Sequence, residues 1–307
     1  MKVSPLLDFK VKSSIHDYEV KFVENVSHVL KSEIRYGDVI IIDNKVKNLY
    51  PDLLKGTNNI KNVIDIDASE DQKSYQGLIP IIHSIAPFVV DRCFEQLKCD
   101  VCYQKLPVNI VSVGASYDYA GLGCTHHCPG DIATLKTLPG MEIIVPGTPE
   151  EFDLLFSETY SNDHPTYYRL SENSNSINFP VKFGYANVIQ SGSLATVLAV
   201  GPALRFVLKA VEDLDVTLIY YTTVEPFDIG TLLNNSISNK YIIIEPYYSS
   251  GLSAEIHNAF GNNPLTIKNI AVPKIFLTNY GRSEDHDEKL GFNIENIRFT
   301  INSFINE

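Results

Sequence analysis

The sequence predicts an α/β protein with mainly parallel sheets, and three observations support that class. Short runs of β-branched and aliphatic residues alternate with longer amphipathic segments along the 307 residues. The short runs are apolar on both faces, which is typical of strands covered on both sides, as in a parallel sheet. A hydrophobic fraction of 44% and a charged fraction of 20% allow a buried core and exclude a largely disordered chain.

The expected elements follow from these patterns in chain order. The β-branched runs predict strands at residues 39–42, 63–66, 79–82, 108–113, 143–145, 196–200, 216–220 and 241–244. Apolar residues at helical spacing predict helices at residues 18–31, 88–103, 148–159, 203–214 and 294–304. The third helix has a well-marked start, because Thr148 can act as N-cap, with Pro149 at the first helical position and Glu151 at the third.

One polar stretch divides the chain into two parts. Residues 171–178 are polar and show no periodicity, which is typical of a linker. We therefore expect a first domain at residues 1–170, a linker at 171–182 and a second domain at 183–307.

Charge and cysteine content argue against several classes of function. The chain has 25 Lys and Arg against 37 Asp and Glu, a net charge of -12, which disfavours binding to nucleic acid or to an anionic membrane. No stretch reaches the roughly 18 uncharged apolar residues of a membrane helix, and the first residues lack the apolar core of a signal peptide. With five cysteines and no export signal, we expect a cytoplasmic protein with reduced thiols.

The densest polar cluster, residues 121–131, follows a predicted strand. Loops at the carboxyl ends of parallel strands are where α/β proteins place their sites. Gly121 and Gly123 allow the backbone to approach a ligand closely, and His126 and His127 can donate, accept or carry protons near neutral pH. A structural loop whose histidines bind neighbouring backbone is an equally open alternative.

Other positions also have a functional and a structural interpretation. Glu70 follows a predicted strand, where it can hold a proton or simply favour a helix start. Phe88 and Arg92 lie one helical turn apart, as an aromatic platform and a cation or as a core residue and a solvated one. Arg169 can bind an anion or form a surface ion pair. A zinc site is a further, weaker alternative, because two of its possible ligands, Cys99 and Cys102, lie inside a predicted helix. The full set of possible ligands is Cys99, Cys102, Cys124, Cys128, His126 and His127.

Taken in chain order, several segments resemble the C-terminal half of transketolase and its relatives, 1-deoxyxylulose-5-phosphate synthase and the β subunit of 2-oxo acid dehydrogenases. Residues 82–96 are similar to the helix that carries the family's aromatic platform, and residues 123–127, Gly-Cys-Thr-His-His, resemble its Gly-Pro-Thr-His-His. Residues 131–141, 168–170 and 225–228 match further family segments. The resemblance implies a pyrimidine-type, thiamine diphosphate-binding parallel-sheet domain followed by a transketolase C-terminal α/β domain.

The resemblance also implies roles for individual residues. Glu70 corresponds to the acid that hydrogen-bonds the aminopyrimidine ring, a role in both catalysis and cofactor binding. Phe88, stacked on that ring, and Arg92 are implied as cofactor-binding residues, and His126 and His127 as catalytic proton carriers. The implied substrate-binding residues are His83, Thr125, His126 and Arg169.

The family's diphosphate domain, with a Gly-Asp-Gly and a later Asn that hold Mg²⁺, has no counterpart in this sequence. The resemblance therefore implies a partner chain that carries this domain and the metal, and it implies no metal ligand here. The assembly implied is a heterotetramer that also uses the family's dimer interface.

The implied activity is that of a transferase subunit, active only with its partner. It transfers a two-carbon ketol or related acyl unit from a ketose or 2-oxo donor to an aldehyde acceptor. A catalytically degenerate structural or regulatory subunit is the alternative, because about two helical turns are missing after Glu70. Glu172 stands where the family has a phosphate-binding Arg, so either the substrate lacks the usual phosphate or the phosphate is held elsewhere.

Overall fold

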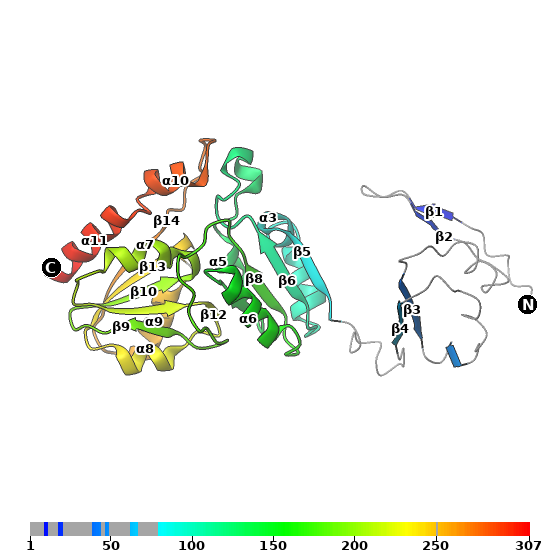
Figure 1. Ribbon diagram of the computed structural model, residues 1–307, viewed down its shortest axis with the longest axis horizontal. Helices are drawn as coiled ribbons and strands as arrows, with labels where there is room; N and C mark the ends of the chain where they lie inside the picture. Colours follow the sequence, from blue (N-terminus) through cyan, green and yellow to red (C-terminus); the bar gives the residue numbers. More distant parts are fainter. Residues whose placement is uncertain are drawn as a thin grey trace, which may run out of the picture. The chain divides into compact units, whose positions relative to one another are not determined.

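The chain forms two units, Met1–Leu78 and Ile79–Glu307, in a computed structural model (Figure 1). The structure describes residues 9–11, 18–20, 39–43, 47–48, 62–66, 79–249 and 251–307. Each unit is described by itself below.

The described part of the first unit includes two pairs of strands and two helical residues, 47–48. β1 (Phe9–Val11) pairs antiparallel with β2 (Tyr18–Val20), and β3 (Val39–Asp43) pairs parallel with β4 (Asn62–Ile66). The strands predicted at residues 39–42 and 63–66 are therefore confirmed. The helix predicted from residue 18 is wrong over Tyr18–Val20, because these residues pair with β1 as a strand.

The second unit contains a first sheet with the order β12-β7-β8-β6-β5. The strands β5 to β8 are parallel to one another, as the sequence predicts, and β12 is antiparallel to β7. Side chains such as Ile110, Ile143 and Tyr167 are fully buried in this sheet. Its strands are β5 (Ile81–Ile85), β6 (Asn109–Val113), β7 (Glu142–Ile144), β8 (Thr166–Arg169) and β12 (Thr223–Glu225).

A second sheet of the same unit has the order β14-β13-β10-β11-β9. It is parallel except for β9, which is antiparallel to β11. The predicted strands at 196–200, 216–220 and 241–244 match three of its members to within a few residues. The strands are β9 (Asn187–Gln190), β10 (Thr196–Val200), β11 (Thr217–Tyr221), β13 (Lys240–Tyr248) and β14 (Thr266–Val272).

Helices accompany both sheets. The helix predicted at 88–103 is interrupted: α3 (Ala86–Val89) and α4 (Phe94–Gln96) are separated by a turn, and α4 continues into a π-helical segment, Leu97–Cys102. The predicted cap of α6 is confirmed, because Thr148 Oγ1 accepts from the Glu151 amide at 3.1 Å. The other helices are α5 (Asp131–Leu135), α6 (Pro149–Thr159), α7 (Leu204–Ala210), α8 (Ile229–Asn235), α9 (Leu252–Phe260), α10 (Ser283–Leu290) and α11 (Ile294–Asn306).

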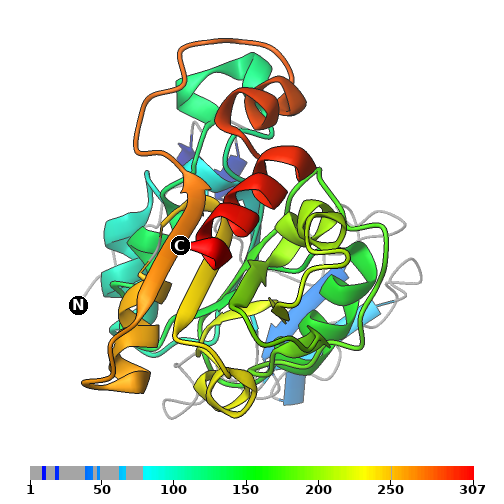
Figure 2. The ribbon, with the colours of Figure 1, turned by 90° about the vertical axis from the view of Figure 1, so that its left-hand side faces the viewer.

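Two features of the second unit matter for the site. β12, from the later part of the chain, adds a strand to the first sheet and so ties the two sheets together. The connection between β14 and α10 rises beside the loop that follows β6 (Figures 1 and 2). The domain boundaries expected near residues 170 and 183 stay a prediction. No described helix has the length and apolarity needed to cross a membrane.

Candidate functional site

The loop after β6 places the predicted histidines at the carboxyl end of the first sheet. Its base is closed by a hydrogen bond of 2.8 Å from the Cys128 amide to the Ser116 carbonyl. Gly114 starts the loop with φ of +73°, and a Cβ there would lie 2.5 Å from Cε2 of Tyr119. Only glycine meets both demands without strain, so the aromatic ring and the reversed backbone fix the path of the loop together.

Phe88, Arg92 and His126 form one side of the candidate site. The rings of Phe88 and His126 are 5.6 Å apart between centroids and tilted by 54°, and Arg92 Cζ lies 3.9 Å from the Phe88 centroid. Thr125 Oγ1 lies 3.0 Å from His126 Nδ1. Because the hydroxyl occupies this ring nitrogen, Nε2 of His126 is left to meet a ligand.

His127 faces a second histidine that comes from the C-terminal part of the chain. The His127 and His286 rings are 6.0 Å apart and nearly perpendicular, and the Tyr117 ring lies 5.3 Å from His286. Nε2 of both histidines is buried, with no hydrogen-bond partner among the described residues. Burial lowers the pKa of His127, and the charges of His286 and His126 lower it further, against a hydrogen bond to the Ala120 backbone.

Tyr117 and Asp287 link the loop to α7 and α10. The Tyr117 hydroxyl donates to Asp287 Oδ1 at 2.7 Å, and Arg205 donates to Asp287 Oδ2 at 2.6 Å. Burial raises the pKa of Asp287, while the bonds from Tyr117 and Arg205 oppose the rise. This carboxyl therefore joins the loop of the first sheet to two helices of the second.

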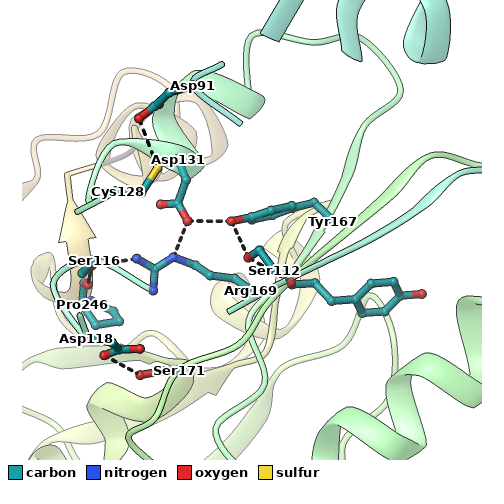
Figure 3. Close-up of polar contacts among 11 residues, drawn as sticks. Asp91, Ser112, Ser116, Asp118, Cys128, Asp131, Tyr167, Arg169, Ser171 and Pro246 are labelled. Carbon is teal, nitrogen blue, oxygen red and sulfur yellow. Dashed lines mark hydrogen bonds and ion pairs between the residues drawn. The ribbon is translucent and has the colours of Figure 1, made fainter. Parts of the chain in front are cut away.

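A buried ion pair supports the loop from below (Figure 3). Arg169 Nε donates to Asp131 Oδ2 at 2.7 Å, with side chains only 1% and 0% exposed. Tyr167 donates to the same oxygen at 2.8 Å, and Arg169 Nη2 donates to Ser116 Oγ at 2.7 Å. The Ser116 hydroxyl in turn donates to the Pro246 carbonyl on β13. Burial lowers the pKa of Arg169, but Asp131 outweighs this and raises it overall, so the guanidinium stays charged.

Asp118 fastens the predicted linker to the same loop. It accepts from the Ser171 hydroxyl at 3.1 Å, the Glu172 amide at 3.0 Å and the Asn173 side-chain amide at 3.2 Å. Burial raises its pKa, and these hydrogen bonds lower it in part. A cavity of about 30 Å³, room for roughly one water molecule, lies beside Asp118 and Arg205.

The structure brings some of the predicted residues together and not others. Phe88, Arg92, Thr125 and His126 lie side by side, and His127 is adjacent in sequence. His83 lies on β5, where its Nδ1 is 3.0 Å from the Val111 carbonyl. Glu70 lies outside the described residues, so its role stays a prediction.

Arg169 and the cysteines have surroundings that differ from the sequence-based alternatives. Arg169 is no surface ion pair, because it is buried and bound to Asp131 and Ser116. Among the described residues no group of three or more His, Cys, Asp and Glu side chains is placed to hold a metal ion. The described cysteines have free thiols: Cys93, Cys99, Cys102, Cys124 and Cys128.

Sequence reasoning missed the contribution of the C-terminal half. His286, Asp287 and Arg205 were not identified as site residues, and Tyr280, which approaches Gly123, was not either. The run Asp285-His286-Asp287 is a visible signal in the sequence. It gave no indication of which loop the histidine would meet, because that depends on how α10 packs.

The geometry suits a particular kind of chemistry. An aromatic ring beside a cation and a histidine can hold a flat heteroaromatic ring, and a histidine whose pKa is lowered by burial, as that of His127 is, can accept and return a proton. The fold and the geometry thus define an α/β protein with a candidate ligand site at the carboxyl edge of a parallel sheet.

Comparison with known proteins identifies the family. Residues 73–176 match the family described as transketolase, pyrimidine binding domain. An uncharacterized 33.6 kDa protein in the fasciation locus of Rhodococcoides fascians is 33% identical over 233 residues, 75% of this chain and 75% of the relative. One subunit of the apulose-4-phosphate transketolase from Phocaeicola vulgatus is 26% identical over 232 residues, 72% of this chain and 74% of that one.

The fold gives the same answer. A split-gene transketolase, solved as an inactive β4 tetramer, superposes with a TM-score of 0.67 and 18% sequence identity, over 92% of this chain and 96% of that one. The chain belongs to the transketolase family. The predicted fold class and the resemblance to the C-terminal half of transketolase are therefore confirmed.

Proposed function

We propose that this chain is the C-terminal subunit of a split, thiamine diphosphate-dependent transketolase-like enzyme. The observation that carries the proposal is the placement of the Phe88 ring 5.6 Å from the His126 ring, centroid to centroid, at the carboxyl ends of the strands of a pyrimidine-binding domain. With a partner, the subunit transfers a two-carbon ketol or related acyl unit from a ketose or 2-oxo donor to an aldehyde acceptor.

The partner in this proposal carries the diphosphate-binding domain with Gly-Asp-Gly and a later Asn, and holds Mg²⁺. Two observations support a partner: one relative is itself named as a single subunit of a transketolase, and a split-gene transketolase was solved as an inactive β4 tetramer. We propose a cytoplasmic heterotetramer in which residues 1–170 form the pyrimidine domain and residues 183–307 the C-terminal domain.

The described residues fit the pyrimidine half of thiamine diphosphate. The Phe88 ring offers an aromatic surface, and the buried Nε2 of His127 lacks a hydrogen-bond partner among the described residues. When bound, the cofactor supplies a nucleophilic carbon that attacks the donor carbonyl. Phe88 and Arg92 would hold the ring, and Glu70 would hold a proton at the ring nitrogen.

The histidines of the chain do the remaining work. Thr125 fixes His126 at Nδ1, so Nε2 of His126 would exchange a proton with an oxygen atom of the donor substrate. His127, kept neutral by burial, would accept a proton nearby. His83 completes the proposed substrate side. For Arg169 we propose a structural role in place of the implied substrate contact, because its described bonds are internal.

Calorimetry tests the proposal first. Thiamine diphosphate and Mg²⁺ are titrated into this chain alone, and then into the complex with a chain that carries Gly-Asp-Gly. Binding only in the complex supports a split enzyme. A complex that forms without binding the cofactor supports the degenerate, structural subunit instead.

Variants in the complex test the individual roles. Glu70→Gln should abolish turnover while thiamine diphosphate still binds, and unchanged turnover would contradict the assignment. His126→Ala should lower donor cleavage about 10²- to 10⁴-fold, far more than it lowers cofactor affinity. His257→Ala is the matched control, because this exposed histidine lies on α9, where its Nδ1 is 2.7 Å from the Ser253 carbonyl of its own helix.

A further inference from the structure

His286 lies outside residues 73–176, which match the family's pyrimidine-binding domain, yet its ring packs against the ring of His127. We propose that His286 of α10 is a positioning residue for His127: it fixes the His127 ring and keeps that ring uncharged, so that Nε2 of His127 is available as a hydrogen-bond acceptor.

The packing of the two rings carries the proposal. Their centroids are 6.0 Å apart at an interplanar angle of 79°, so the edge of one ring meets the face of the other. His286 is 2% exposed, and Nε2 of each ring is sealed from solvent without a partner among the described residues. A half-buried and a buried imidazole at this distance cannot both be positively charged without strong mutual repulsion.

His127 has only one ring nitrogen that a ligand can use. Its ring also forms a hydrogen bond with the backbone of Ala120, which favours a proton on that side of the ring. In the neutral ring the buried Nε2 then carries the lone pair and can accept a hydrogen bond. Burial and the charges of His286 and His126 all lower the pKa of His127.

Charged and titratable groups surround His286. On its own helix, the hydrogen bond from the Arg282 backbone lowers the pKa of Asp285, and the charges of Arg282 and His286 lower it further. Asp287 is the next residue, but its two oxygens are occupied by Tyr117 and Arg205. The groups that face it from other elements are Tyr117 and His127 of the loop after β6 and, through Asp287, Arg205 of α7.

The consequence is that His127 resists protonation. Burial and the neighbouring His286 both lower the pKa of His127, so His127 stays neutral. The value of this arrangement for catalysis rests on the proposed function, whereas the coupling between the rings does not.

The coupling is measured by NMR on the full-length chain with ¹⁵N-labelled histidine. The pH titration of the His127 ring nitrogens, assigned with His127→Gln, is followed in the wild type and in His286→Gln and His286→Phe. We expect the His127 midpoint to rise by about 0.5 to 2 pH units in both variants, the range that Coulomb's law gives for unit charges about 6 Å apart in an effective dielectric of about 80 to 20. His257→Gln, a control on α9, should leave it unchanged.

The result that overturns the proposal is a His127 midpoint that stays within about 0.2 pH units of the wild type in a folded His286 variant, well below the Coulombic range. If both variants fail to fold, the wild type decides: coupled rings give a two-step curve at His127, and independent rings give a single step. If the His127 midpoint moves but the complex shows no ketol transfer, the coupling of His127 to His286 is supported and the proposed function is refuted. An unmoved midpoint with an active complex would do the reverse.

Discussion

Removing the charge of Asp131 should be among the most damaging isosteric changes in the second unit. Asp131→Asn keeps the shape of the side chain but leaves the Arg169 guanidinium, 1% exposed, without its counter-charge. Losing one partner of a buried pair costs about 3–5 kcal/mol, a large share of the 5–15 kcal/mol that stabilise a typical domain. The Tyr167 hydroxyl also loses a charged acceptor at 2.8 Å.

Urea denaturation followed by tyrosine fluorescence measures this loss, since the chain has 17 Tyr and no Trp. Asp285→Asn is the control: its ion pair with Arg282 is exposed, so the change should shift the urea midpoint far less than Asp131→Asn does. The double variant Asp131→Asn with Arg169→Met buries no charge, so it should be less destabilised than the sum of the two single changes by at least about 1 kcal/mol.

Two results would refute this reasoning. One is a loss below about 1 kcal/mol for Asp131→Asn, which would mean that the Arg169 charge finds compensation elsewhere. The other is a double variant whose loss equals the sum of the single losses, which would mean that the two groups do not interact.

Three further predictions concern the loop, the pH dependence and the substrate. Gly114→Ala should lower the free energy of unfolding by about 1–3 kcal/mol, because the new Cβ would lie 2.5 Å from Tyr119 at φ of +73°. Gly140→Ala is the control and should cost only about 1 kcal/mol, because Gly140 has φ of +80° but nothing within 4 Å of a Cβ. Equal melting temperatures for the two variants would contradict the steric argument. Burial raises the pKa of Glu151, so the folded state binds this proton more tightly than the unfolded state, and stability falls as the pH rises from about 4.5 through the folded pKa. Glu151→Gln should therefore flatten the dependence of the melting temperature on pH in this range. An unchanged pH dependence would contradict the prediction. Glu172→Arg in the assembled enzyme should raise kcat/KM for phosphorylated ketoses about tenfold or more relative to unphosphorylated ones. If the unaltered enzyme accepts only phosphorylated ketoses, Glu172 does not exclude a phosphorylated substrate and the inference is wrong.

Much of the fold was accessible from local sequence patterns. The alternation of apolar runs and amphipathic segments predicted the strands around residues 108–113, 196–200 and 241–244, because these patterns reflect the periods of the backbone itself. The N-cap of α6 at Thr148 was predictable because its hydrogen bond to the Glu151 amide spans only three residues. The predicted helix at 88–103 failed in part, since a turn and a π-helical segment interrupt it.

The sequence by itself determined the α/β class, the family and the loop that carries His126 and His127, because glycines, histidines and a preceding strand are local features. Only the tertiary structure decided which groups surround that loop. The pairing of Asp131 with Arg169 and the packing of His127 against His286 join residues that are distant in the chain. Such contacts depend on how sheets and helices pack, and burial in that packing is what turns ordinary side chains into a strong ion pair and a coupled pair of histidines.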